Sequence, residues 1–307
     1  MKKILFQKVI VYQILGQINN AIVKSKKGIF LSLGGMLFIT PDSLFIRLSN
    51  IESWDLVFYR GLIPFICLLF GLLFYYKKDF LSFCYAIGFA GVLNAIIVSL
   101  TNVTFIISIE NTNVANTLIL LSLSPFMAAF MSLLFLKEFP KKRTWIAMIF
   151  CLLFVIFIFY DSYGAGRIYG DIFGFITAFL VGASAVVIRS AKLVNFLPSL
   201  MLAKLFTMLI SVYFVQSLNL TGSDIYIIPI MCIFMVTIPL MLLTLAPRYI
   251  PAHEVEIFFV LETTLGPFWV WLVINEQPSL KTIIGGALII STLFIHTFME
   301  LKDKRNG

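Results

Sequence analysis

Residues 54–76 read WDLVFYRGLIPFICLLFGLLFYY, a continuous run in which only Asp55 and Arg60 carry a charge. A helix needs about 20 mostly apolar residues to cross a hydrocarbon core of about 30 Å. Strands of outer-membrane barrels give shorter segments that alternate between apolar and polar residues, so a barrel does not fit this run. The stretch therefore predicts a transmembrane helix.

The rest of the chain repeats this composition. Of 307 residues, 60% are apolar and 12% are charged, whereas a soluble domain has about 25% charged and about 45–50% apolar residues. Turn residues and charges divide the chain into ten predicted spans, at about 28–49, 54–76, 80–107, 112–136, 143–160, 170–190, 197–217, 225–246, 251–274 and 280–299. The sequence thus predicts an all-α polytopic membrane protein with ten transmembrane helices.

Residues 1–27 stand apart as a basic N-terminal segment. They begin with Met1-Lys2-Lys3 as a signal peptide does, but polar residues such as Lys8 and Gln13 interrupt the apolar region and no small-residue cleavage site follows. Apolar residues recur at roughly helical spacing among the lysines. Two interpretations remain open, a basic helix on the cytoplasmic membrane surface and a disordered tail.

The basic residues predict the orientation of the chain. Eighteen of the 23 Lys and Arg residues fall in the tail, in residues 301–307 or in loops on the same predicted side, and three (Arg47, Arg167 and Lys281) fall on the other side. Positive loops remain in the cytoplasm, so both termini should be cytoplasmic, in the inner membrane of a bacterium. Because the net charge of +8 is spread over short loops, it does not favour a nucleic-acid partner. Neither the cysteines nor His253 and His296 have metal-ligand spacing, and no cofactor is expected.

Two halves of the chain match each other in register. Gly28 and Arg47 bracket the first span as Gly170 and Arg189 bracket the sixth, and Leu-Lys-Glu138-Phe-Pro before span 5 corresponds to Ile-Asn-Glu276-Gln-Pro before span 10. Five spans per half are an odd number, so residues 28–160 and 168–300 should form two inverted five-helix repeats. Chance similarity between apolar helices is the alternative. Inverted repeats are typical of secondary carriers, which bind substrate near the membrane midplane.

Two motifs then carry a family resemblance. Leu-Ser-Leu-Ser-Pro125 with Leu-Phe-Leu-Lys-Glu138, and Leu-Glu262-Thr-Thr-Leu-Gly-Pro267-Phe-Trp-Val-Trp271 with Asn-Glu276-Gln-Pro, resemble the fourth and ninth helices of EamA-type proteins of the drug/metabolite transporter superfamily. Arg60 at the head of span 2 also resembles the family pattern. Thr263 departs from it, because a proline commonly follows that glutamate. The resemblance covers about residues 28–300 and implies transport of amino acids, nucleotides, sugars, drugs or similar solutes.

Charged residues within spans are the first candidates for function, because an ionisable group at the bilayer centre costs about 3 kcal/mol or more. Glu262 lies near the middle of span 9, with Glu256 and Glu254 one to two turns nearer the cytoplasm. A carboxylate there can bind a substrate amine or alternate between protonated and ionised states to couple proton flow. The alternative is a structural ion pair of Glu262 with Arg60 or Lys204.

Other polar residues allow a functional and a structural interpretation. Asp42 follows Pro41, which frees a backbone carbonyl, and Ser184 is its counterpart in the repeat. Arg60 and Lys204 can bind an anionic substrate group, or neutralise buried carboxylates and form gate pairs. Four amides and hydroxyls (Asn94, Asn116, Thr117 and Thr237) line the pathway or join helices by hydrogen bonds, and Trp269 or Trp271, two apart, meets the cavity or anchors the interface. Glu138 and Glu276 are interpreted as helix-end residues that satisfy the first amides of the next helix.

The function predicted from these features is transport of a small metabolite, an amino acid or a related amine or organic solute, by alternating access, with proton coupling or exchange. The partners would be the solute, protons and the lipid bilayer, for a monomer or a homodimer. A membrane-embedded enzyme acting on a lipid-linked or small polar substrate is the alternative, although the group of His253, Glu254 and Glu256 has no nucleophile in register. The sequence has no phosphate-binding glycine loop of the kind that would indicate an ATP-driven pump. It also has no pattern that predicts a ring of charge, as a channel would require.

Overall fold

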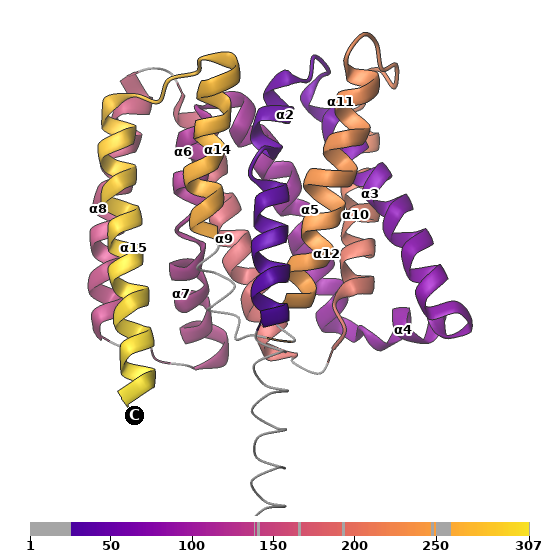
Figure 1. Ribbon diagram of the computed structural model, residues 1–307, viewed down its shortest axis with the longest axis horizontal. Coiled ribbons are helices and arrows are strands. Elements are labelled where there is room, and N and C mark those ends of the chain that lie inside the picture. Colours follow the sequence, from indigo (N-terminus) through magenta and orange to yellow (C-terminus); the bar gives the residue numbers. More distant parts are fainter. Residues whose placement is uncertain are drawn as a thin grey trace, which may run out of the picture.

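The computed structural model describes residues 26–137, 139, 142–164, 167–191, 194–246, 249 and 259–306, and these residues form helices with no β-strand among them (Figure 1). Of the predicted surface helix or tail at residues 1–27, residues 1–25 lie outside the described residues. Glu138, His253, Glu254 and Glu256 also lie outside them. The predicted all-helical architecture is confirmed for the part of the chain that is described.

The first half begins with a helix at residues 26–39, a turn at Thr40 and Pro41, and α2. The elements that follow are α2 (Asp42–Leu48), α3 (Ser53–Tyr76), the 3-10 turn η1 (Lys77–Asp79), α4 (Phe80–Ala86), α5 (Gly88–Asn111), α6 (Val114–Leu121), α7 (Ser124–Leu136) and α8 (Lys142–Gly164). The second half consists of α9 (Ile168–Ser190), α10 (Leu197–Val212), α11 (Asp224–Ile230), the π-helix η2 (Met231–Thr237), α12 (Ile238–Leu245), α14 (Phe259–Ile274) and α15 (Leu280–Asn306).

Seven helical segments among the described residues are long and apolar enough to cross a membrane. They are Lys26–Leu48, Ser53–Ala86, Gly88–Asn111, Val114–Leu136, Lys142–Tyr160, Ile168–Ser190 and Asp224–Leu245. Three shorter apolar helices, Leu197–Val212, Leu261–Ile274 and Leu280–Thr292, fall where the sequence predicts spans 7, 9 and 10. The protein is therefore a multi-helix membrane protein, while ten complete crossings and the inversion of the repeats stay predictions.

The outer surface of the bundle is apolar. Large side chains such as Phe74 and Tyr85 are 83% and 84% exposed, and a soluble protein rarely exposes contiguous apolar surface on this scale. Conversely, Asp42, Arg60 and Lys204 are buried. Lipid is as apolar as these outer side chains, so the polar groups gather inside, where they can meet one another.

Several spans are broken where their sequence breaks the backbone hydrogen-bond ladder. The first bends at Thr40–Pro41, because proline lacks an N–H and clashes with the preceding turn. The third is divided between α4 and α5 at Gly88, whose φ is +58°, and the fourth is divided between α6 and α7 ahead of Pro125. In η2, the Thr237 hydroxyl donates to the Cys232 carbonyl at 2.7 Å, five residues earlier. These breaks place irregular backbone in the bundle interior, where other protein groups can satisfy it.

The helices that carry the polar residues pack closely. α5 lies against α9 and α10, and α3 lies against α10. At Gly61, a Cβ atom would stand 2.5 Å from the Met208 amide nitrogen and 2.9 Å from the Lys204 carbonyl oxygen. Only glycine therefore allows α3 and α10 to approach backbone to backbone here. α8 and α15 pack as a pair at one side of the bundle, at the left in Figure 1.

Candidate functional site

Four buried charged residues and one half-buried amide, from α2, α3, α10, α14 and α5, form what is here called the central cluster: Asp42, Arg60, Lys204, Glu262 and Asn102. Four of these were predicted as site residues from the sequence. The fifth, Asn102, was not, although an amide within a predicted span is a signal of the same kind as Asn94 and Asn116. The cluster brings together elements from both halves of the chain.

Asp42 and Arg60 form a bidentate ion pair within this cluster. Nη1 and Nη2 of Arg60 donate to Oδ1 and Oδ2 of Asp42 at 2.6 and 2.8 Å, and both side chains are almost fully buried. The turn at Pro41 places Asp42 at the start of α2, opposite the second turn of α3. Two parallel charge-assisted hydrogen bonds are the strongest arrangement for such a pair. Of the partners considered for Arg60, the structure selects Asp42 rather than Glu262.

Glu262 lies on α14 and is 5% exposed. Its carboxylate interacts electrostatically with Asp42 and Arg60, and no hydrogen bond from a described residue reaches it. Since Arg60 already gives two donors to Asp42, Glu262 faces a pair whose charges largely cancel. A buried carboxylate that keeps its acceptors open is suited to bind a cationic group or a proton.

Lys204 carries the charge opposite to that of Glu262, and it too has no ion-pair partner among the described residues. Its side chain is 0% exposed and donates to Oδ1 of Asn102 at 2.7 Å, while the Asn102 amide donates to the Val98 carbonyl at 2.7 Å. An ammonium group has three donors, and Asn102 is the acceptor found for it among the described residues. Lys204 interacts electrostatically with Arg60 and Asp42, as Glu262 does. Both side chains therefore lie near the same Asp42–Arg60 pair.

Asn94 serves a different purpose. Its amide donates to the Ser199 hydroxyl at 3.2 Å, and its carbonyl accepts a hydrogen bond from Ser184 at 2.7 Å. Ser199 in turn donates to the Gly91 carbonyl. These bonds join α5 to α9 and α10, which favours the interhelical interpretation of Asn94 over a place in the central cluster.

Trp269 borders the turn that positions Asp42. Its indole N–H donates to the Thr40 hydroxyl at 3.2 Å, and its ring is half-buried, while Trp271 is exposed on the outer surface. At Gly266, about one helical turn before Trp269 on α14, a Cβ atom would stand 3.5 Å from Ser43 Oγ. α14 thus packs directly on the start of α2, and of the two tryptophans the one facing inward is Trp269.

Asn116 lies in a second polar group, at the end of the bundle where α14 is joined to α15. This group is here called the Glu276 network and consists of Arg47, Thr112, Asn116, Asp171, Glu276 and Thr282. Glu276 was predicted to satisfy the first amides of the next helix, α15. It instead accepts the Val114 amide of α6 at 2.9 Å, far back in the chain, so that detail of the prediction is wrong.

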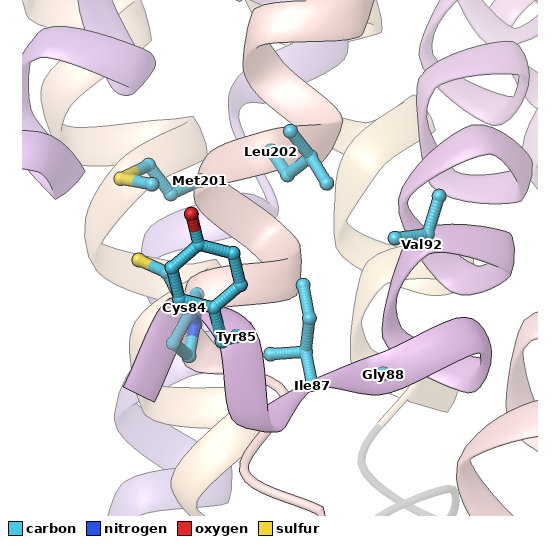
Figure 2. A pocket seen from close by; sticks show the side chains of 8 residues that line it. Cys84, Tyr85, Ile87, Gly88, Val92, Met201 and Leu202 are labelled. Carbon is cyan, nitrogen blue, oxygen red and sulfur yellow. The ribbon is translucent and has the colours of Figure 1, made fainter. Parts of the chain in front are cut away.

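Glu256 lies outside the described residues, as do Glu254 and His253. Among the residues that the structure does describe, no group of three or more His, Cys, Asp and Glu side chains could hold a metal ion. A cavity of about 300 Å³ opens between α4–α5 and α10, shown in Figure 2, and its lining is almost entirely apolar. It contains no residue of the central cluster, so it is not the site described above.

Comparison with known proteins gives a family match for the first half of the chain. Residues 26–160 match the model of the EamA-like transporter family. This part of the chain belongs to that family. The EamA-like unit holds Asp42, Arg60 and Asn102, and the resemblance expected from the sequence is confirmed, as is the assignment to membrane transport proteins of the drug/metabolite type.

The fold of the whole chain also has a solved relative. A structure described as "Crystal structure of protein" superposes with a TM-score of 0.63, covering 90% of this chain and 97% of its own, at 13% sequence identity. The likeness concerns the fold alone. The comparison with curated proteins gave no match.

Proposed function

We propose that the chain is a secondary carrier that moves a small organic solute across the bacterial inner membrane by alternating access, with the central cluster as its binding site. The observation that supports this best is the pair of buried, oppositely charged side chains, Glu262 and Lys204, that lack an ion-pair partner among the described residues. Unpaired charges inside a membrane protein are expensive and mark substrate or ion pathways by default.

The arrangement of charge suggests the kind of solute. Glu262 offers acceptors to an amine and Lys204 offers donors to an anionic group. Both interact electrostatically with the Asp42–Arg60 pair, whose own hydrogen bonds are made to each other. A solute with one amine and one acidic group, such as an amino acid, complements both ends. Proton coupling or exchange at Glu262 would supply the driving force. Family membership of residues 26–160 supports a carrier, and the in-register similarity of the two halves of the sequence supports inverted repeats.

The first prediction concerns Glu262. Purified protein in proteoliposomes should catalyse saturable counterflow of at least one solute from a panel of labelled metabolites. Glu262→Gln keeps the size of the side chain and loses its charge, so counterflow of an amine-bearing solute should fall at least about tenfold, since losing a charge partner in a buried site is worth 2 kcal/mol or more. Glu52→Gln, which changes an exposed carboxylate, is the matched control and should transport normally.

The other outcomes have distinct meanings. Counterflow that survives in Glu262→Gln while pH-driven accumulation disappears would assign Glu262 to proton coupling alone. Loss of folding in detergent would assign it a structural role. Normal driven transport by the variant would contradict the proposed site, and hydrolysis or group transfer of a panel member would favour the membrane-embedded enzyme.

A further inference from the structure

The Glu276 network joins the two halves of the chain at one end of the bundle. Nε of Arg47, in the last turn of α2, lies 3.1 Å from Oε2 of Glu276. Nη2 of Arg47 donates to Oε1 of Glu276 at 3.4 Å and to the Thr112 carbonyl at 2.6 Å. Glu276 belongs to the connection between α14 and α15. One ion pair therefore fastens the end of α2 to the end of α14, and these are the two helices that carry Asp42 and Glu262.

Glu276 holds a third element as well. Its Oε1 accepts the amide of Val114, the first residue of α6, at 2.9 Å. The first amides of a helix have no partner within the helix, so this bond satisfies a group that α6 itself leaves open. A single carboxylate thus positions α2, α6 and α14 relative to one another.

Residues in the second half of the chain also form hydrogen bonds with the start of α6 and the residue pair before it. Asp171, in the first turn of α9, accepts hydrogen bonds from the Thr112 hydroxyl at 2.5 Å and from the Asn116 amide at 3.2 Å. Thr282 of α15 donates to the Asn116 carbonyl at 2.7 Å. Gly170 lies so close that a Cβ atom there would stand 2.5 Å from the carbonyl carbon of Asn111. This end of the bundle is tightly closed.

The exposure of the ion pair distinguishes it from the pair in the central cluster. The side chains of Arg47 and Glu276 are 24% and 22% exposed, against almost none for Asp42 and Arg60. Water can replace the partners of a partly exposed pair, so such a pair opens at little cost, whereas separating a buried pair strands two charges. The Arg47–Glu276 pair can therefore break and re-form within a working cycle, and the buried pair cannot do so as easily.

We propose that Glu276 is the positioning residue of a gate that closes this end of the carrier, and that its release from Arg47 and Val114 opens a path from this end to the central cluster. The proposal rests on the carrier function proposed above. Asp42 and Arg47 lie on one helix, about 7.5 Å apart along its axis at 1.5 Å per residue. A movement of the end of α2 would therefore also displace Asp42 in the central cluster.

Cys232 is a native reporter for this gate. It is 0% exposed and interacts electrostatically with Arg60, Asp42 and Lys204, so a reagent reaches it only through an open path. Cys67, Cys84 and Cys151 would be replaced by alanine, and a membrane-impermeant methanethiosulfonate reagent would be added to intact cells and, separately, to inverted vesicles. A second reporter, Ser43→Cys on a cysteine-free chain, covers the same region, because Ser43 is 2% exposed beside Gly266.

We expect Glu276→Gln and Arg47→Gln to raise the labelling rate about two- to fivefold, the range that corresponds to loss of a partly exposed ion pair. The increase should appear from the Glu276 side alone, with an unchanged midpoint of thermal unfolding in detergent. Glu52→Gln, which changes an exposed carboxylate at the same end, is the matched control and should label at the parental rate.

Two results would overturn the gate. Unchanged labelling in both Glu276→Gln and Arg47→Gln would mean that the pair holds nothing closed. Labelling that rises from both sides together with a lowered unfolding midpoint would mean that Glu276 merely stabilises the fold. Counterflow is measured on the same variants, so one-sided labelling in a protein that transports no solute of the panel would support the gate and count against the carrier instead.

Discussion

Asp42 and Arg60 form the contact on which the central cluster depends most. Burying two charges is expensive, and only their mutual hydrogen bonds offset the loss of water. Both oxygens of Asp42 are occupied by Arg60, whereas Nε of Arg60 is buried and has no hydrogen-bond partner among the described residues. In the proposed carrier the charges of this pair cancel near Glu262 and Lys204, which leaves those two side chains for the solute.

The second prediction follows from this pair. Asp42→Asn should destabilise the protein by about 3–5 kcal/mol, because the guanidinium of Arg60 would remain buried without its counterion. The double variant Asp42→Asn with Arg60→Gln should recover part of that loss, since no charge is then stranded. Thermal unfolding in detergent, followed by tryptophan fluorescence, measures both. A double variant less stable than Asp42→Asn alone would contradict a dominant ion pair.

The charged members of the cluster were predictable from the sequence, because Asp42, Arg60, Lys204 and Glu262 are ionisable residues within apolar runs. Their pairing was not. Which side chains meet depends on the rotation of each helix about its axis, and helices in lipid are rotated by packing of small residues and by interhelical hydrogen bonds. Asn102 shows the same limit, because nothing in its own span marks it as the acceptor for a lysine on α10.

At the scale of elements, the helical character of the apolar runs was predicted correctly, and their interruptions were not predicted. Residues 80–107 were expected as one helix, whereas the structure has α4, a break at Gly88 and α5. The hydropathy of an apolar run reports burial in lipid and is blind to a single residue at positive φ. The composition likewise gives no sign of the π-helix η2. Within η2, the Thr237 hydroxyl donates to the Cys232 carbonyl five residues earlier.

The third prediction tests the contact between α3 and α10. Gly61→Ala places a methyl group against the backbone of Met208 and the Lys204 carbonyl, and overpacking of this kind costs about 1–3 kcal/mol. Because the helix that carries Lys204 must shift, transport should weaken together with stability. Gly71→Ala is the matched control on the same helix, since nothing lies within 4 Å of a Cβ atom there. Equal unfolding midpoints for the two variants would contradict the close approach.

At the scale of the whole molecule, the polar groups divide by depth. The central cluster is buried, whereas the Glu276 network and the tie between Asp224 and the Asn50 amide lie at the end of the bundle where α2, α11 and α14 terminate or begin (Figure 1). The opposite end holds η1 with Lys77 and Lys78. Asp224 and Glu276 thus lie at one end of the bundle and Lys77 and Lys78 at the other, while the orientation of the chain stays a prediction.

The last prediction concerns that orientation. Reporters fused after Lys78 and Gly307 should be cytoplasmic, and a reporter fused after Gly222 should be periplasmic, because loops rich in Lys and Arg remain on the cytoplasmic side. Lys78 lies in η1, between α3 and α4, and Gly222 lies just before α11. Alkaline phosphatase, active in the periplasm, and green fluorescent protein, fluorescent in the cytoplasm, give opposite signals at each fusion. A periplasmic C-terminus would require an odd number of crossings, which cannot be divided into two inverted five-helix halves. If instead the whole bundle were inverted, the proposed gate would face the cytoplasm. The fusion after Lys78 would then be periplasmic, so the same experiment distinguishes this case.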